Sequence, residues 1–213
     1  MEPIHLAVQT LVKMEEMVAV DQGSAFRGWE GRVLPHIGDA YRTDEDGHRS
    51  HMGASLIGAE CARSIWYNFR WATKPKFDGR ILRLFNRGHL EEGRFIALLL
   101  TIGCEVFQQD AEGKQFRIRH ANGHYGGSGD GVVIKLPDVP EGQPALSEFK
   151  THGEKSFVEL AGPLKDWRQC VKNMVEGKPF TFTGKGVRAC KFEHYVQMQQ
   201  YMHKMRIPLA LYA

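Results

Sequence analysis

Two carboxylates and one lysine have the spacing of a metal site with a basic side chain beside it. Asp130 precedes an apolar run at residues 132–134, and Glu148 and Lys150 follow the next apolar run. The segment between the runs is rich in Pro, Asp and Gly, which predicts a turn. If the runs pair as a hairpin that closes near Val139, Asp130 and Glu148 are each nine residues from the turn. They would then face each other across the two strands.

The residue types at this point favour phosphodiester hydrolysis. Side chains alternate along a strand, so Glu148 and Lys150 share one face while Phe149 points away. The carboxylates of Asp130 and Glu148, with the main-chain carbonyl of Phe149, would favour magnesium or manganese over zinc. Such an ion can activate water and neutralise charge, while Lys150 orients the water, helps to deprotonate it or stabilises the transition state. A solvated charged strand end is the alternative interpretation of this motif taken alone.

Further polar side chains fall on predicted helices. The helix at residues 80–101 has an apolar stripe at four- and three-residue spacing, formed by Ile81, Phe85, Gly88, Glu92, Phe95 and Leu99. Glu92 lies in the middle of that stripe, where a carboxylate is costly unless it is paired or holds a metal. Gln197 and Tyr201, four residues apart on a predicted helix at 187–204, share one face. They could brace the lysine and the water, or contact the phosphate.

The order of the elements predicts one α/β or α+β domain in which a mixed sheet is flanked by helices. Helices are expected at residues 4–19, 55–71 (with Ser55 as N-cap), 80–101, 157–176 (broken at Gly162-Pro163) and 187–204. Strands are expected at residues 105–109, 115–120, in the hairpin from 130 to 150, and at 208–213. Residues 20–54 are rich in Gly, Asp, Arg and His and are expected to be an irregular, mobile flap.

The composition describes an ordinary globular chain with a locally uneven charge. It has 213 residues, of which 42% are hydrophobic and 25% charged, and its net charge is only +3. Basic residues outnumber acidic ones by eight to three over residues 63–94 and by six to one over residues 178–206. Two basic regions beside an acidic metal site suit a polyanion, although solvated helix faces are the plainer interpretation of any single residue.

The same inventory argues against several other classes of protein. The four cysteines form no CxxC pair, which argues against a disulfide framework or a structural zinc site. Charged residues interrupt the apolar pattern of residues 1–20, unlike a signal peptide, and the longest apolar run, 95–100, is too short to cross a bilayer. Residues 183–186 lack the spacing of a nucleotide-binding P-loop. We therefore expect a cytoplasmic protein without a membrane partner.

Some histidines and aromatic residues have simpler expected roles. No HExxH or HxH motif is present, so we expect ordinary surface side chains rather than zinc ligands at His120, His124 and His152. We expect most of four aromatic side chains to lie in the core, namely Trp66, Tyr67, Phe69 and Trp71. At most one of these rings would be exposed and able to stack on an unpaired base.

Taken in order, the motifs resemble those of one nuclease superfamily. They are Gly88-x-x-x-Glu92 on a helix, Gly129-Asp130-Gly131, Glu148-Phe149-Lys150 on a strand, and Gln197-x-x-x-Tyr201 on a later helix. Upstream, Ser55, Cys61 and Arg63 have the spacing of an N-terminal signature found in RecB-type nucleases. The chain thus resembles the PD-(D/E)xK nuclease superfamily, in its RecB-like and lambda-exonuclease-like branch. The resemblance covers residues 55–213 as a nuclease domain and leaves residues 1–54 as an N-terminal helical and irregular extension.

This resemblance implies a restriction-endonuclease-like core and a deoxyribonuclease that requires Mg²⁺ or Mn²⁺. The implied metal ligands are Glu92, Asp130, Glu148 and the main-chain carbonyl of Phe149, and the implied catalytic residues are Asp130, Glu148, Lys150, Gln197 and Tyr201. The implied DNA contacts are Ser55, Arg63, Arg87, Lys185 and Arg188. The leading expectation is an exonuclease that acts on DNA ends in recombination or repair. It would work in a bacterial or phage-infected cell and could be encoded by a phage. The alternatives are an endonuclease or junction resolvase on the same fold, and a catalytically silent DNA-binding subunit.

The resemblance to this branch also implies partner molecules, and the sequence departs from the pattern of the branch at two positions. Its lambda-like members form rings and work beside a single-strand annealing protein, so both a homo-oligomer and such a partner are implied by resemblance. Some members place a histidine where Glu92 stands, whereas His89 here directly follows Gly88; we expect His89 to support a ligand or contact phosphate. Cys61 matches the first iron–sulfur cysteine of some members, but no later cysteine group follows it. We therefore expect no cluster and a small buried side chain at Cys61.

Overall fold

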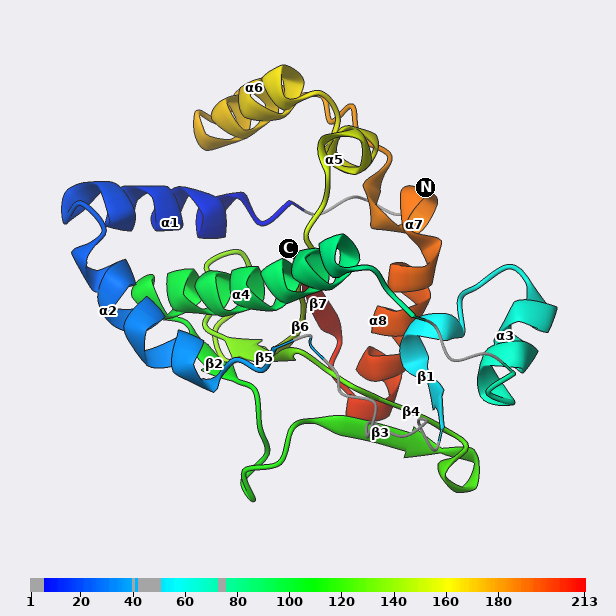
Figure 1. The fold of residues 1–213 in the computed structure, drawn as a ribbon. Helices are drawn as coiled ribbons and strands as arrows, with labels where there is room; N and C mark the ends of the chain where they lie inside the picture. Colours follow the sequence, from blue (N-terminus) through cyan, green and yellow to red (C-terminus); the bar gives the residue numbers. More distant parts are fainter. Residues whose placement is uncertain (1–5, 40, 42–50, 73–75) are drawn as a thin grey trace.

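The computed structural model describes residues 6–39, 41, 51–72 and 76–213 (Figure 1). Its α-helices are α1 (Val8–Val20), α2 (Ser24–Val33), α3 (Ala62–Phe69), α4 (Gly79–Thr101), α5 (Glu154–Ala161), α6 (Leu164–Val175), α7 (Gly186–Cys190) and α8 (Phe192–Met205). Its strands are β1 (Met52–Gly53), β2 (Glu105–Phe107), β3 (Arg117–His120), β4 (Tyr125–Ser128), β5 (Gly131–Ile134), β6 (Ala145–Glu148) and β7 (Leu209–Tyr212). Three single-turn 3₁₀ helices are η1 (Leu34–His36), η2 (Ala54–Leu56) and η3 (Ala121–Gly123).

The strands form two mixed sheets. The larger sheet has the order β2-β5-β6-β7, in which β5 is antiparallel to β2 and β6 while β7 is parallel to β6. The smaller sheet has the order β1-β4-β3, with β1 parallel and β3 antiparallel to β4. Every residue of β6 is buried, as expected for a central strand covered on both faces. The chain is therefore a mixed α/β protein, as the sequence predicted.

Helices cover both faces of the larger sheet. One core cluster joins Met14 of α1 and Leu99 of α4 to Ala145 of β6. A second cluster joins Met198 and Tyr201 of α8 to Leu146, the next residue of β6. Neighbouring residues on a strand point to opposite faces, so α4 and α8 lie on opposite sides of the sheet. The smaller sheet and α3 lie at one end of the molecule, beside α8 (Figure 1).

The predicted hairpin is confirmed in its register. Gly131 pairs with Ser147 and Val132 with Leu146, which places Asp130 opposite Glu148. The predicted helix at 80–101, the break at Gly162-Pro163 and the final strand are likewise confirmed, within one or a few residues.

Residues 20–54 are the clearest error of the sequence-based prediction. Within them, α2 and η1 are helical, and α2 packs along α4. Just after η1, Ile37 also lies close to α4, since a Cβ at Gly93 would be 2.8 Å from it. The α2 sequence conceals the helix because it contains two glycines and none of its residues is fully buried. Instead, the side chain of Asp21 caps it by accepting hydrogen bonds from three main-chain N–H groups. Residues 42–50 of the expected flap lie outside the described residues.

Two further helices are shorter than predicted. The helix expected at 55–71 consists of η2 and then α3, which begins after Cys61, and the helix expected at 187–204 is divided at Lys191 into α7 and α8. The helix expected at 157–176 starts three residues earlier, as α5. In the described part of the chain, no helix is both long and apolar enough to cross a membrane.

Candidate active site at the junction of the two sheets

One extended segment carries Asp130 from the smaller sheet to the larger one. Strand β4 ends at Ser128, Gly129 and Asp130 follow, and β5 begins at Gly131. Asp130 Oδ2 accepts a hydrogen bond of 2.9 Å from the main-chain N–H of Phe149, which ties this segment to the end of β6. The predicted meeting of Asp130 with Glu148 and Lys150 therefore occurs at the junction of the two sheets.

The ammonium of Lys150 contacts the oxygen atoms that the sequence predicts as metal ligands. It forms an ion pair with Glu148 Oε1, lies 4.0 Å from Asp130 Oδ2, and donates a hydrogen bond of 3.2 Å to the main-chain carbonyl of Phe149. Carboxylate and carbonyl oxygens gathered around a cation are the donor set that hard divalent ions prefer. The three predicted ligand atoms thus converge on one position of positive charge.

Glu148 is a costly residue in this position. Its side chain is fully buried; the Lys150 ammonium is the counter-charge and hydrogen-bond donor at Oε1, whereas Oε2 has no hydrogen-bond partner within the described residues. Burial raises the pKa of Glu148 to about 7, opposed by the charge of Lys150 and assisted by that of Asp130. A buried carboxylate with an unpartnered oxygen is expensive unless a cation compensates its charge, so Glu148 has the character of a cation ligand.

Glu92 approaches the same site from α4. Gly88, one turn earlier, lies against Thr151, because a Cβ there would be 3.7 Å from the Thr151 hydroxyl. Burial, then the charge of Asp130, raises the pKa of Glu92 to about 7, with Lys150 opposing. Within the described residues, however, no three His, Cys, Asp or Glu side chains lie close enough to hold a metal ion. Glu92 therefore shares the electrostatic field of the site without forming a closed three-carboxylate cluster.

Gln197 and Tyr201 of α8 are buried beneath this junction. The Tyr201 hydroxyl donates a hydrogen bond of 2.9 Å to the Ser128 carbonyl, two residues before Asp130. Burial, then the charge of Glu148, raises the pKa of Tyr201, so the hydroxyl keeps the proton that it donates. The fit is close, since a Cβ at Gly127 would lie 2.3 Å from that hydroxyl oxygen. Tyr201 thus fixes the strand that carries Asp130, rather than pointing into solvent.

A histidine–tyrosine cluster beside Lys150 was missed from the sequence. His152 Nε2 and His194 Nδ1 lie 2.9 and 2.8 Å from the Tyr212 hydroxyl, and His152 Nδ1 lies 3.0 Å from Ser156 Oγ. Burial, then the charge of Lys150, lowers the pKa of His194 to about 4. The prediction of a plain surface role is therefore wrong for His152, while His120 and His124 are exposed as expected. The sequence could not predict this cluster because it depends on the parallel pairing of β7 with β6, which places Tyr212 beside Glu148.

The other predicted contact residues are spread over the surface. Lys185 pairs with Glu159 at 2.9 Å, the Arg188 guanidinium lies over the ring of Tyr195, and Arg87 lies 3.8 Å from Glu91. Ser55, Arg63 and His89 are also exposed. Within the described residues, the ion pairs of Lys185 and Arg87 are with Glu159 and Glu91, and not with Asp130 or Glu148.

Two predictions about burial are wrong. Cys61 is exposed, and its sulfur accepts a hydrogen bond from the Ser64 N–H at the start of α3, so it acts as a helix cap. Trp66, Tyr67 and Trp71 are also exposed rather than in the core, while Phe69 is half-buried.

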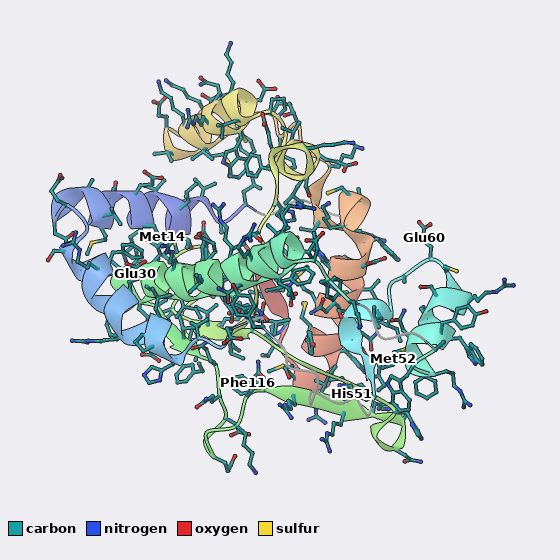
Figure 2. All side chains as sticks on the ribbon, in the orientation of Figure 1. Met14, Glu30, His51, Met52, Glu60 and Phe116 are labelled. Atoms are coloured by element: carbon teal, nitrogen blue, oxygen red, sulfur yellow. The ribbon has the colours of Figure 1, made fainter. Side chains whose placement is uncertain are left out.

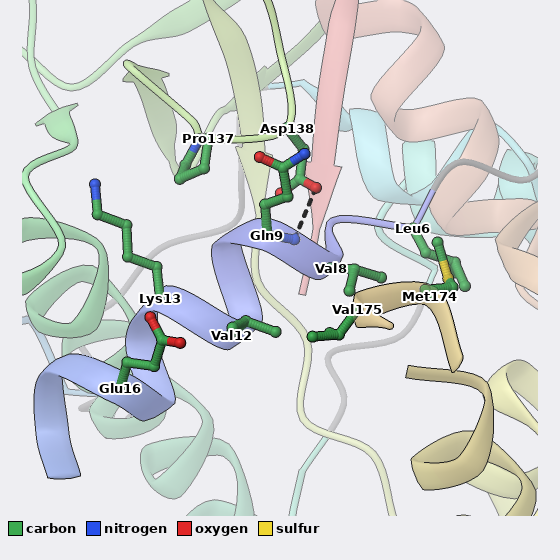
Figure 3. A pocket seen from close by; sticks show the side chains of 10 residues that line it. All are labelled: Leu6, Val8, Gln9, Val12, Lys13, Glu16, Pro137, Asp138, Met174 and Val175. Carbon is green, nitrogen blue, oxygen red and sulfur yellow. Dashed lines mark hydrogen bonds between the residues drawn. The ribbon is translucent and has the colours of Figure 1, made fainter. Parts of the chain in front are cut away.

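A separate hollow of about 580 Å³ lies between α1 and α6 (Figure 3). Its wall is mostly apolar, with Val8 and Val12 on one side and Met174 and Val175 on the other. Asp138 at its rim accepts hydrogen bonds from the N–H groups of Gln9 and Thr10, so its carboxylate caps α1. None of the residues that line this hollow belongs to the candidate active site.

Comparisons of the chain with models of protein families, with curated proteins and with solved structures find no match.

Proposed function

We propose that this chain is a Mg²⁺- or Mn²⁺-dependent deoxyribonuclease with a restriction-endonuclease-like core. The observation that carries the proposal is the convergence of Asp130 Oδ2, Glu148 Oε1 and the Phe149 carbonyl on the Lys150 ammonium. The spacing in the sequence predicts this convergence, and the β5–β6 register produces it. A surface charge pair would not need a fully buried carboxylate as its acceptor.

The donor set suits a hard divalent ion. Among the described residues, Glu148 Oε2 has no hydrogen-bond partner, and Asp130 uses Oδ2 for the Phe149 N–H. Asp130, Glu148 and the Phe149 carbonyl would hold the ion, and Glu92 would approach it by a change of side-chain conformation. When bound, the ion supplies an activated water and neutralises charge on the phosphate. Lys150 is 29% exposed, so its long side chain can swing toward solvent and release the oxygens.

Lys150, Tyr201 and Gln197 would have different roles in the reaction. The Lys150 ammonium stabilises negative charge on the phosphoryl oxygens and orients the attacking water. That water forms the new P–O bond as the bond to the leaving oxygen breaks; the water's proton passes to solvent and the leaving oxygen is protonated from solvent. Tyr201 acts at a distance, by fixing Ser128 and hence the segment that ends in Asp130. Gln197, one turn before Tyr201 and also buried, supports its hydroxyl.

We propose an exonuclease that acts on DNA ends in recombination or repair in the cytoplasm of a bacterial or phage-infected cell. The support is the order of the motifs and the two basic regions of the sequence. A ring-shaped homo-oligomer and a single-strand annealing partner belong to the same proposal. An endonuclease or junction resolvase would use the same residues, and the two differ in whether a free DNA end is required.

The test is a cleavage assay on end-labelled single- and double-stranded linear DNA and on closed circular DNA, each in Mg²⁺, Mn²⁺ or EDTA. Wild type is compared with Lys150→Ala and with Lys165→Ala, an exposed lysine of α6 outside both basic regions. Metal-dependent loss of nucleotides from ends, abolished in Lys150→Ala and kept in Lys165→Ala, is the expected result. Cleavage of closed circles would indicate the endonuclease. Binding without cleavage in every metal would overturn the proposal and leave a DNA-binding subunit.

A further inference from the structure

Helix α3 exposes three large aromatic side chains. Trp66 is 55% exposed, Tyr67 48% and Trp71, just beyond the helix, 44%. No residue of α3 is fully buried. A helix of eight residues gains most of its stability from packing an apolar face, so an uncovered face of this kind is unusual. The rings therefore form an exposed aromatic surface on α3.

The surroundings of these rings are strongly basic. Residues 51–71 and 113–129, which include α3 and the smaller sheet, contain five basic side chains (Arg63, Arg70, Lys114, Arg117 and Arg119) and one acidic side chain, Glu60. None of these five basic residues forms an ion pair with a carboxylate within the described part of the chain. By contrast, residues 154–176 of α5 and α6 contain four acidic and four basic residues. The end of the molecule that holds α3 and the smaller sheet, where Figure 2 labels Glu60 and His51, thus carries an excess of positive charge that α5 and α6 lack.

On this surface one arginine lies over an aromatic ring, and two more arginines lie on the smaller sheet. The Arg70 guanidinium lies over the Trp66 ring, 6.0 Å from its centroid, and Trp66 meets Tyr67 edge to face at 5.3 Å. On the smaller sheet, Arg117 pairs with Ser128 and Arg119 with Gly126. Paired residues project from the same face, so both arginines flank the small residues of β4. Flat rings beside cations provide stacking faces for bases together with charge for phosphates.

This surface leads to the carboxylates of the candidate active site. The Phe69 ring of α3 contacts the His124 ring at 5.8 Å, and β4 begins one residue later. From His124 the chain runs along β4 to Asp130, a path of about 20 Å for six extended residues. The α3 end of this surface and the catalytic junction are therefore joined by one strand, β4, and the two arginines lie on its neighbour β3.

We propose that this aromatic and basic surface binds an unpaired DNA strand and leads it toward Asp130 and Glu148. The inference rests on the proposed deoxyribonuclease function. Stacking on Trp66 or Tyr67 requires a base with a free face, which an unpaired strand offers at every nucleotide and a duplex only at its ends. A protein partner with an apolar segment would leave the basic side chains without counter-charges, whereas phosphates supply them. The ligand class is thus single-stranded DNA without sequence preference.

The test measures binding separately from cleavage. Fluorescence anisotropy is recorded in EDTA with a labelled oligothymidylate of roughly 16 nucleotides, the upper end of the strand length that one small domain covers. Trp66→Ala and Tyr67→Ala should each raise the Kd by about five- to tenfold, and Trp66→Phe should restore most of the affinity. The matched control is Phe180→Ala, since Phe180 is equally exposed (48%) but lies between α6 and α7; its Kd should equal that of wild type. Circular dichroism of each variant checks that it is folded.

The outcomes separate this inference from the proposed function. Weaker single-strand binding by Trp66→Ala, with blunt duplex binding unchanged, supports the inference whether or not cleavage is found. Equal losses on single-stranded and duplex DNA, or a loss in Phe180→Ala as large as in Trp66→Ala, would overturn it. A shift in sedimentation between wild type and Trp66→Ala with no change in DNA binding would also overturn it, because the rings would then join two copies of the chain. Metal-dependent cleavage with unaltered binding in both ring variants would leave the nuclease proposal standing and remove this one.

Discussion

Lys150 and Glu148 form an ion pair whose two members differ sharply in exposure. The carboxylate of Glu148 is fully buried, whereas the side chain of Lys150 is 29% exposed. Removal of one partner therefore does not have the same consequence as removal of the other. Without Lys150, a buried charge loses its counter-charge; without Glu148, the ammonium can reach water and still lies near Asp130.

We expect this asymmetry to appear in stability measured without metal. At pH 8, where Glu148 is ionised, Lys150→Ala should lower the free energy of unfolding by about 3 kcal/mol, as for one partner removed from a buried pair. Glu148→Leu should be at least as stable as wild type, because it replaces a buried charge by an apolar side chain. Both variants should lack nuclease activity. Urea unfolding in EDTA measures the difference, and a Glu148→Leu protein less stable than Lys150→Ala would contradict it.

The glycines before Asp130 should differ in their tolerance of a side chain. At Gly127 a Cβ would lie 2.3 Å from the Tyr201 hydroxyl oxygen and 2.8 Å from Ala54 Cβ. At Gly129 its nearest neighbour would be Leu146 Cδ1 at 3.7 Å, an ordinary contact. Gly127→Ala should therefore destabilise the protein by about 1–3 kcal/mol through overpacking, whereas Gly129→Ala should change stability by less than about 1 kcal/mol.

The Gly127 effect should be coupled to Tyr201. Tyr201→Phe removes the hydrogen bond to Ser128 and should by itself lower stability by about 1 kcal/mol and reduce cleavage, because the segment before Asp130 is less well fixed. In the double variant Gly127→Ala/Tyr201→Phe the clashing oxygen is absent, so the combined loss should be smaller than the sum of the two single losses. Thermal unfolding of the four proteins gives the coupling energy. Strict additivity would show that the close approach is relieved in some other way.

The site was predictable from sequence where local patterns determine geometry. The turn centred on Val139 sets the β5–β6 register, and that register alone places Asp130 opposite Glu148. The stripe on α4 likewise placed Glu92 toward the site, because helical periodicity fixes which residues share a face. These features depend on residues close together in the chain.

The missing parts of the site depend on pairings between distant residues. Tyr212 reaches the site because β7 joins β6 in parallel, and no turn sequence records a parallel partner. The exposure of Trp66 and Tyr67 could not be predicted from the sequence either, since an aromatic residue on an amphipathic helix is normally buried. Helix α2 was missed because its glycines lower helix propensity, while its packing on α4 supplies the stability.

The connection between β5 and β6 should support the N-terminal helix. The carboxylate of Asp138 accepts hydrogen bonds from the Gln9 N–H, the Thr10 N–H and the Thr10 hydroxyl, at 2.9, 2.7 and 2.6 Å. Asp138→Ala should lower the free energy of unfolding by about 1–2 kcal/mol, as for loss of a helix cap, and leave cleavage unchanged. Glu141→Ala, an exposed carboxylate in the same connection, is the control and should match wild type. Loss of activity in Asp138→Ala at temperatures where it is folded would contradict a purely structural role.

His194 should make the protein sensitive to mild acid. It lies against the Tyr212 hydroxyl and close to Lys150, His152 and Lys191, and burial together with these charges lowers the pKa of His194 from 6.5 to about 4. Since the folded-state pKa is the lower one, the unfolded chain takes up the proton first as the pH falls. The contribution of this group to stability is therefore complete above pH 6.5 and is lost progressively toward pH 4.

His194→Gln should flatten this dependence. The difference in unfolding free energy between wild type and His194→Gln should change by up to about 3 kcal/mol between pH 7 and pH 4, in the direction that weakens wild type in acid. The comparison must be a difference, because the raised pKa values of Glu92 and Glu148 act in the opposite sense in both proteins. His203→Gln, at an exposed position on the same helix, should follow wild type across the range. Urea unfolding at each pH gives these values, and parallel curves for wild type and His194→Gln would show that the buried histidine takes up its proton without loss of stability.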